Sequence, residues 1–335
     1  MQPLATDLAA LARRTPGMTA RALLLVPASL AILAALPAPA AADGLPAVGV
    51  DAAPLSTFGG KLEYVTARAK PDTVLRERTV ARGRVLRALR LKGNFTIPAV
   101  AYDRSPSGLS ADGRTLVLIS PRTHFPRATT TFAVIDAKRM GLRRHIRLRG
   151  DFSFDAISPD GRLVYLINYL SKSDFTKYAV RAYDMRARRL LRDPVVDPSE
   201  PGEDMSGLPM SRVSDAEGRW AYTLYSGRKH PFVHALDTEG RTAVCIDLDD
   251  VHSLGGLELH GARLDVLGGG GGVVASIDTS THRVIPRPAK RKPATEESAA
   301  GIPWLLIAAP TAALLLLAAI SRRRRSAENV RAGRA

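Results

Sequence analysis

Residue types that could support catalysis or metal binding are present in the chain, but their spacing matches no catalytic pattern. His230 and His234 are four residues apart, a spacing that directs two imidazoles at one metal only along a helix, whereas here they straddle a loop and a strand. The segment DPSEPGEDM, from residue 197, carries four carboxylates, enough for an opportunistic calcium ion but without the ligand register of an EF-hand. No GxSxG elbow occurs, and no Ser, His and Asp set follows from spacing. The sequence therefore predicts no catalytic residue, metal ligand or cofactor.

A glycine-rich stretch and a single cysteine could also suggest a functional site, but neither has the residues that such a site requires. LGGGGGVV, residues 267–274, lacks the Lys-Ser or Lys-Thr pair and the following helix of a phosphate-binding loop, so we interpret it as a connection between strands. Cys245 is the only cysteine, which excludes a disulfide framework within the chain. Its place in the strand-like TAVCIDLD favours a small buried apolar residue.

The elements that would have to position any site are repeated. ISPDGRLVYLIN, residues 157–168, combines an apolar lead-in, a polar turn containing Gly, an Arg and an alternating strand, and the same layout occurs at 109–120, 213–225 and 257–268 and more faintly at 56–66. The marker glycines are separated by 53, 48, 57 and 43 residues; they are Gly60, Gly113, Gly161, Gly218 and Gly261. Repeats of this length are typical of propeller blades.

A second unit follows each turn and carries an acid at a constant position: Asp136, Asp184, Asp237 and Asp278, with Thr79 in the first copy. In the clearest copy the strands are expected at 154–157, 163–167, 180–183 and 190–196. We predict an all-β fold, a β-propeller of about five four-stranded blades. A β-sandwich is the main alternative, but it does not require a period.

The repeats resemble the surface-layer and periplasmic propellers of the YVTN and TolB type. The likeness covers roughly residues 56–288 and is clearest in SPDGRLVYLIN, the following V-x-x-x-D unit and RHIRLRG. The WD40 signature pairs Gly-His and Trp-Asp are absent in register. The resemblance implies a scaffold for many kinds of ligand, including proteins, polymers and, in some branches, lactone or quinone chemistry, so it does not by itself supply a function.

Residues that recur in every copy are expected to stabilise turns. Asp112 and Asp160 should hydrogen-bond their own turns, Gly113 and Gly161 should supply a positive φ, and the acids at 136, 184, 237 and 278 should close the turn between the third and fourth strands. A role repeated in every blade is a folding role, so we expect function where the blades differ.

The blades differ in their connections. Because antiparallel strands alternate in direction, the short turns share one face and the longer insertions, at 94–106, 121–130, 169–178, 197–207 and 226–231, share the other. Long loops on a rigid scaffold are where binding sites usually lie. The predicted binding residues on this face are Arg122, His124, Phe125, Arg127, Lys172, Phe175, Lys177, Arg228, Lys229 and His230.

The ends of the chain predict where the propeller works. Residues 1–42 are interpreted as a signal peptide with Met1 or Met18 as its start, 43–288 as the propeller and 289–301 as a Pro- and Ala-rich stalk. Residues 302–320 are nineteen residues without a charge and are predicted to span the membrane once, with the basic tail 321–335 in the cytoplasm. The alanine-rich apolar segments and Arg-heavy usage resemble those of a high-GC actinobacterium.

These features together predict a membrane-tethered module outside the cell. Of the formal net charge of +16, residues 1–42 carry +2 and the tail from Ser321 carries +5, which leaves +9 for the part predicted outside the cell. This charge favours a protein or an anionic envelope polymer as partner, and the topology makes nucleic acid an unsuitable one. Binding or scaffolding through the loop-rich face is the first hypothesis. The alternative is an extracytoplasmic lactonase-like hydrolase with a metal at the mouth of the central channel, and a purely architectural envelope protein is the third.

Overall fold

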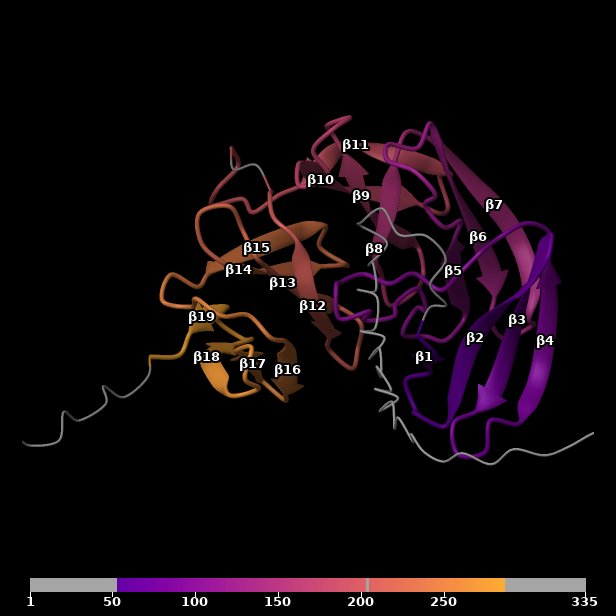
Figure 1. Cartoon of the computed structure of the whole chain (residues 1–335), viewed down its shortest axis with the longest axis horizontal. Coiled ribbons are helices and arrows are strands. Elements are labelled where there is room, and N and C mark those ends of the chain that lie inside the picture. Colours follow the sequence, from indigo (N-terminus) through magenta and orange to yellow (C-terminus); the bar gives the residue numbers. More distant parts are fainter. Residues whose placement is uncertain (1–52, 203–204, 287–335) are drawn as a thin grey trace, which may run out of the picture. The chain divides into compact units, whose positions relative to one another are not determined.

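In the computed structural model, which describes residues 53–202 and 205–286, all the regular elements are β-strands. They form five antiparallel sheets that follow one another along the chain (Figure 1). The first contains β1 (Leu55–Ser56), β2 (Leu62–Ala69), β3 (Asp72–Thr79) and β4 (Val85–Leu91); the second contains β5 (Thr115–Ile119), β6 (Thr129–Asp136) and β7 (Gly141–Arg149).

The remaining three sheets have four strands each. The third contains β8 (Phe152–Ile157), β9 (Leu163–Tyr169), β10 (Tyr178–Asp184) and β11 (Arg189–Val195); the fourth contains β12 (Pro209–Ser214), β13 (Trp220–Tyr225), β14 (Phe232–Asp237) and β15 (Thr242–Asp247); the fifth contains β16 (Leu257–His260), β17 (Arg263–Leu267), β18 (Val273–Asp278) and β19 (Arg283–Val284). Within every sheet, strands that are consecutive in the chain are hydrogen-bonded neighbours. The predicted repeat of antiparallel blades is confirmed.

The second sheet lacks a first strand of its own. In its place, Leu109 forms an isolated bridge to Leu116 of β5, and the amide of Val117 donates to the carbonyl of Gly108 at 2.8 Å. The pairing is short because Gly108 has a φ of +119°, outside the extended region. The lead-in strand predicted for this copy is therefore a bridge, and the blade is completed only in part.

The turns explain why the repeat has its particular residues. The five marker glycines lie in the turns before the second strands and all have φ between +60° and +70°, a conformation that costs a residue with a Cβ about 1–2 kcal/mol. Asp112 accepts a hydrogen bond from the amide of Arg114, and Asp160 from that of Arg162, each at 2.9 Å. These side chains close their own turns.

The acids of the second unit act in the turns between the third and fourth strands. Asp184 accepts from two backbone amides at 2.8 Å, Asp237 does so at 3.0 and 2.9 Å, and Asp136 and Asp278 also accept from amides of their turns. The residue four positions after this site, which is Thr79 in the first copy and an acid in the others, is left-handed in every copy: Gly83, Met140, Arg188, Arg241 and His282. Four of these five are not glycine, so the acid's hydrogen bonds hold the turn in a backbone conformation that its residues do not favour.

The hydrophobic core lies between consecutive sheets. One cluster joins the first and second sheets, including Leu75 and Ile135, and the next joins the second and third, including Val134 and Leu166. Two further clusters join the third sheet to the fourth and the fourth to the fifth. In the described ranges, no cluster contains residues of both the first and the fifth sheets. Each blade thus buries its faces against its neighbours in the chain, as blades of a propeller do.

The turn of one blade also packs on the next, which makes a matched test possible. A Cβ at Gly161 would lie 2.5 Å from Oγ1 of Thr115 in the preceding blade, whereas a Cβ at Gly113 would meet nothing within 4 Å. Gly161→Ala is therefore expected to lose about 2–4 kcal/mol through both the positive φ and the clash, and Gly113→Ala about 1–2 kcal/mol through φ alone. Thermal unfolding of both variants measures the difference, and equal losses would contradict the proposed packing between blades.

The predicted signal peptide 1–42, stalk 289–301, membrane span 302–320 and tail 321–335 lie outside the described residues. Within the described residues, no helix is long and apolar enough to cross a membrane.

Candidate functional site

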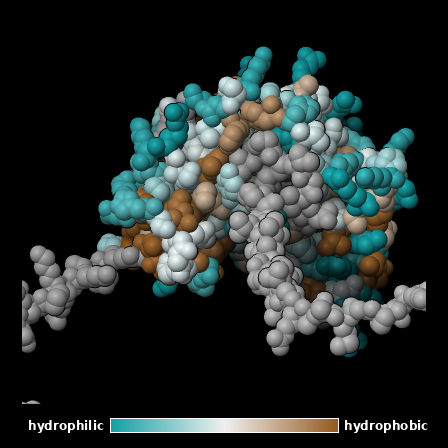
Figure 2. Space-filling view, in the orientation of Figure 1, coloured by the Kyte–Doolittle hydropathy of each residue, from teal (hydrophilic) through white to brown (hydrophobic). Residues whose placement is uncertain are grey.

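The long connections lie where the strand order requires. The segments between β5 and β6, β9 and β10, and β13 and β14 join second to third strands, and the segment between β11 and β12 joins two sheets. In the orientation of Figure 1, the outer edge of the described surface carries mostly hydrophilic side chains, and apolar side chains lie inside this edge (Figure 2). Leu170, at the start of the β9–β10 connection, is 63% exposed, the largest value for a described large hydrophobic residue.

One predicted loop is not a surface loop. Of residues 94–106, Phe95, Ile97, Val100 and Ala101 are buried. The amide of Tyr102 donates to the carbonyl of Pro209 at 2.9 Å, so this segment is held on β12 of the fourth sheet. Phe95 and Ile97 belong to the core cluster of the first and second sheets and Val100 to that of the second and third, so the segment contributes to the interior.

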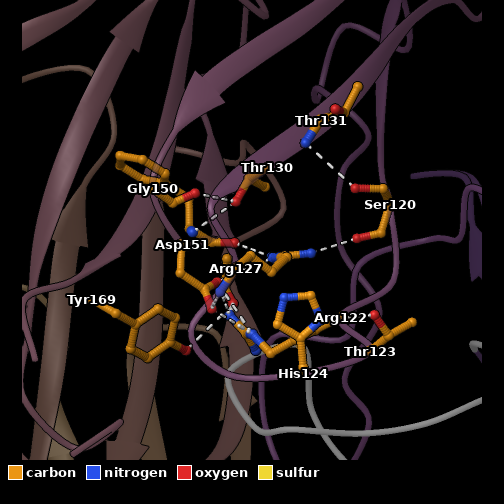
Figure 3. Close-up of polar contacts among 12 residues, drawn as sticks. Ser120, Arg122, Thr123, His124, Arg127, Thr130, Thr131, Gly150, Asp151 and Tyr169 are labelled. Atoms are coloured by element: carbon orange, nitrogen blue, oxygen red, sulfur yellow. Dashed lines mark hydrogen bonds and ion pairs between the residues drawn. The ribbon is translucent and has the colours of Figure 1, made fainter. Parts of the chain in front are cut away.

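Arg122 and Arg127, both predicted to be binding residues, are instead buried. They are 2% and 7% exposed and converge on Asp151, which is 5% exposed and lies just before β8. Figure 3 shows the carboxylate between the two guanidinium groups; the distances are 2.6 Å from Nη2 of Arg122 and 3.1 Å from Nε of Arg127. The amide of Arg127 also donates to Asp151 at 2.8 Å. A buried charge must be paired to be tolerated, so these arginines hold the second sheet to the third and are not partner contacts.

The neighbouring candidates form an aromatic cluster around this ion pair. The guanidinium of Arg122 lies 4.8 Å from the ring centre of Tyr169 and 5.9 Å from that of Phe125. Phe125 packs edge-to-face on Tyr169 and on Phe175, with ring centres 5.5 and 6.1 Å apart. Phe125 and Phe175 are half-buried, whereas His124, Lys172 and Lys177 are exposed. The aromatic side chains therefore support the loops, and the exposed cations remain available to a partner.

The last three candidates line a cavity of about 690 Å³ between the β11–β12 and β13–β14 connections. Arg228 and Lys229 are exposed, and His230 is half-buried with its Nδ1 3.5 Å from a carboxylate oxygen of Asp247. A cavity of this size is within the usual range for ligand sites. The structure therefore separates the predicted set into a buried pair of arginines, an aromatic and cationic group on the β5–β6 and β9–β10 connections, and a group that lines a cavity.

A row of polar side chains crosses the fourth sheet beneath this cavity. Arg212, Thr223, His234 and Cys245 are successive cross-strand partners from β12 to β15, so they share one face of the sheet. We call these four residues the polar row. An acid from the third sheet or its connection lies at each end: Asp155 bonds to Arg212, and Asp197 accepts a hydrogen bond from the amide of Cys245 at 2.8 Å.

His234 is the unusual member of the polar row. It is 1% exposed and lines the cavity, and neither ring nitrogen has a hydrogen-bond partner among the described residues. Burial lowers the pKa of His234 to about 4, although the nearby carboxylate of Asp155 opposes the shift. The imidazole is therefore neutral at physiological pH and offers a lone pair.

Side chains that can bind a metal lie close together at the β15 end of the polar row, around Cys245. Ligand atoms of Asp197, Glu200 and Cys245 all lie within 4.8 Å of one another. Burial tends to raise the pKa of Asp197, but hydrogen bonds from Ser199 and from the Cys245 amide outweigh it and hold the pKa below its ordinary value. The side chain of Asp197 is therefore ionised at physiological pH. Among the described residues, these three form the one cluster of acidic, histidine or cysteine side chains whose ligand atoms are close enough together to hold a metal ion.

Sequence reasoning missed this group. Asp197 and Glu200 were considered only within an acidic run that could hold an opportunistic calcium ion. Cys245 was assigned to the core, and His234 to a pair with His230 whose spacing does not suit a metal. The pairing of His234 with Cys245 could have been derived from the hairpin. Asp237, the last residue of β14, pairs with Thr242, the first residue of β15, so the residues three positions before Asp237 and three positions after Thr242 must also be paired.

Comparisons with known proteins concern the fold alone. No family model matches the chain, and no curated protein matches it. Similar solved structures include hydrazine synthase of Kuenenia stuttgartiensis (14% identity, 70% of this chain and 70% of that one, TM-score 0.43) and the Cps50 (Swd1) β-propeller domain of Myceliophteria thermophila (14%, 65% and 62%, 0.41). TolB of Acinetobacter baumannii is another (11%, 69% and 52%, 0.39). The chain spans less than two thirds of the last two structures. Its own five sheets, one after another, carry the assignment of the fold, a β-propeller, as the repeats predicted.

Proposed function

We propose that the chain is a membrane-tethered binding module whose propeller stands outside the cell and binds a protein partner through the cavity and the cationic connections beside it. The observation that carries the proposal is the cavity of about 690 Å³ between the third and fourth sheets, lined by Arg228, Lys229 and His230. Propellers serve widely as binding scaffolds, which agrees with this use of the fold but does not specify it.

The chemistry of the rim determines the kind of partner. Arg228 and Lys229 are exposed at the cavity, and Lys172 and Lys177 are exposed on the neighbouring β9–β10 connection. Leu170 adds exposed apolar surface to the same connection. Cations beside exposed apolar surface suit an acidic protein segment, because charge attracts it and apolar contact retains it. An anionic envelope polymer would use the charges alone.

The extracytoplasmic location is part of the proposal and rests on the sequence. The apolar segment at 302–320, followed by SRRRR, favours a single span with its basic end in the cytoplasm. The apolar segment near the N-terminus, with its small-residue end, favours export.

One experiment tests both location and surface. Intact cells are treated with a membrane-impermeant cross-linker, and the products of the wild-type chain are compared with those of Arg228→Ala/Lys229→Ala. We expect a protein adduct on the wild type that falls at least about tenfold in the variant, since removing two central cationic contacts of an interface typically costs more than 1.4 kcal/mol.

The matched control is Lys138→Ala/Arg139→Ala. These two residues are also an adjacent exposed Lys and Arg, but they lie in the turn between β6 and β7, on the side of the short turns. The control should cross-link like the wild type. Absence of any labelling of the wild type would refute the external location, and an equal loss in both variants would refute the cavity as the binding site.

A further inference from the structure

We propose that Asp197, Glu200, Cys245 and His234 bind a divalent transition-metal ion at the floor of the cavity, with zinc the best match. This metal site does not depend on the partner binding proposed above. Its first support is geometric: the ligand atoms of Asp197, Glu200 and Cys245 lie within 4.8 Å of one another.

The second support is His234. Its imidazole lines the same cavity, is 1% exposed and leaves both ring nitrogens without a hydrogen-bond partner among the described residues. Burying an unpaired polar group costs about 1–3 kcal/mol, and a metal ion bound to the imidazole would recover this cost. His234 pairs with Cys245 across β14 and β15, so the two side chains leave the sheet side by side on one face.

The donor set selects the class of metal. A cysteine sulfur, an imidazole nitrogen and carboxylate oxygens are the ligands of zinc, which takes four of them in a tetrahedron. Calcium and magnesium require oxygen ligands and would gain nothing from the sulfur or the imidazole. With zinc–ligand distances of about 2.0–2.3 Å, the ligand atoms of a tetrahedral site are about 3.5 Å apart. The ligand atoms of Asp197, Glu200 and Cys245 would therefore need to approach one another by about 1 Å. The imidazole of His234, which lies outside that group, would have to turn toward them to supply the fourth ligand.

The position of the ion gives it a structural consequence. Asp197 and Glu200 belong to the connection that follows β11, whereas His234 and Cys245 belong to β14 and β15. A metal bound by all four residues would join the connection of the third blade to the fourth blade and fix one wall of the cavity.

The presence of a single cysteine in the chain makes the test direct. The full-length protein, solubilised in detergent, is treated with a thiol-alkylating reagent, with and without Zn²⁺. Cys245 is partly exposed, so it should react in the metal-free protein, and one equivalent of Zn²⁺ should slow the reaction at least about tenfold because the coordinated thiolate is shielded. A hundredfold excess of Ca²⁺ should give no protection. Absence of protection by Zn²⁺, or equal protection by Ca²⁺, would overturn the proposal.

Co²⁺ supplies a second readout that identifies the ligands. The wild type should show a sulfur-to-cobalt charge-transfer band and the absorption of a four-coordinate ion. Cys245→Ser should abolish the band, and Asp197→Asn should weaken Zn²⁺ binding at least about tenfold, as loss of a ligand does more than the tenfold to hundredfold loss typical of outer-shell partners. The matched control is Asp249→Asn/Asp250→Asn, two exposed acids on the loop after β15 that should retain wild-type binding. Unchanged binding in Asp197→Asn, or an equal loss in the control, would refute the site.

Discussion

Replacing Asp151 by Asn is expected to destabilise the propeller by about 3–5 kcal/mol, because it removes the buried carboxylate on which two buried guanidinium groups converge. The side chains of Arg122 and Asp151 are 1% and 2% exposed, and that of Arg127 is 6% exposed, so water cannot replace the lost carboxylate. For a domain of this size the loss corresponds to a fall in Tm of about 10 °C. Thermal unfolding of Asp151→Asn beside the wild type measures it.

Two further variants separate burial from charge. Asp72→Asn removes the same charge from a pair whose partner, Arg90, is 64% exposed, and its Tm should remain close to that of the wild type. The triple variant Arg122→Met/Arg127→Met/Asp151→Leu removes all three charges and should be more stable than Asp151→Asn, since no buried ion is left unpaired. If Asp151→Asn loses no more stability than Asp72→Asn, the three residues are not the buried network described here.

This network also explains a wrong prediction. Arg122 and Arg127 were placed on the binding face because arginines in a long connection are usually exposed. Their burial depends on Asp151, which belongs to the next sheet, and the repeat contains no information about which loop residue meets which neighbour. The same limit applies to residues 94–106, whose docking on β12 joins segments about a hundred residues apart. The sequence around a residue does not show which residue of another blade it will contact.

Features within a single blade were predictable because each is encoded by its own turn. The glycines at 113 and 161 require a positive φ, and the acids at 184 and 237 close hairpins through hydrogen bonds to residues two and three positions later. The left-handed position four residues after the acid was not recognised, because four of its five occupants are not glycine. Hydrogen bonding by the acid outweighs the local preference there, so composition alone does not mark the position.

The candidate metal ligands fall between these two cases. Pairing of His234 with Cys245 follows from the hairpin and could have been derived from the sequence. Their approach to Asp197 and Glu200 crosses from one blade to the connection of another, and only the packed structure shows it.

Replacing Arg212, the β12 member of the polar row, should destabilise the protein nearly as much as replacing Asp151. Arg212 is 8% exposed and donates through Nη1 to the carbonyl of Asp155 at 2.9 Å, through Nη2 to its carboxylate, and through Nε to Thr223 at 2.5 Å. The second carboxylate oxygen of Asp155 has no hydrogen-bond partner among the described residues. Arg212→Met would therefore leave a buried carboxylate with neither counter-charge nor donor, at a cost of about 3–5 kcal/mol.

A double-mutant cycle distinguishes this pairing from the loss of packing by a long side chain. Arg212→Met, Asp155→Asn and the double variant are unfolded by denaturant, and the free energies of unfolding are compared. Because the two residues form a charge-assisted, multiply bonded pair between β8 and β12, the double variant should lose at least about 1.5 kcal/mol less than the sum of the single losses. Additive losses would mean that Arg212 stabilises the boundary between the third and fourth blades by packing alone, and that the ion pair adds nothing to the contact between β8 and β12.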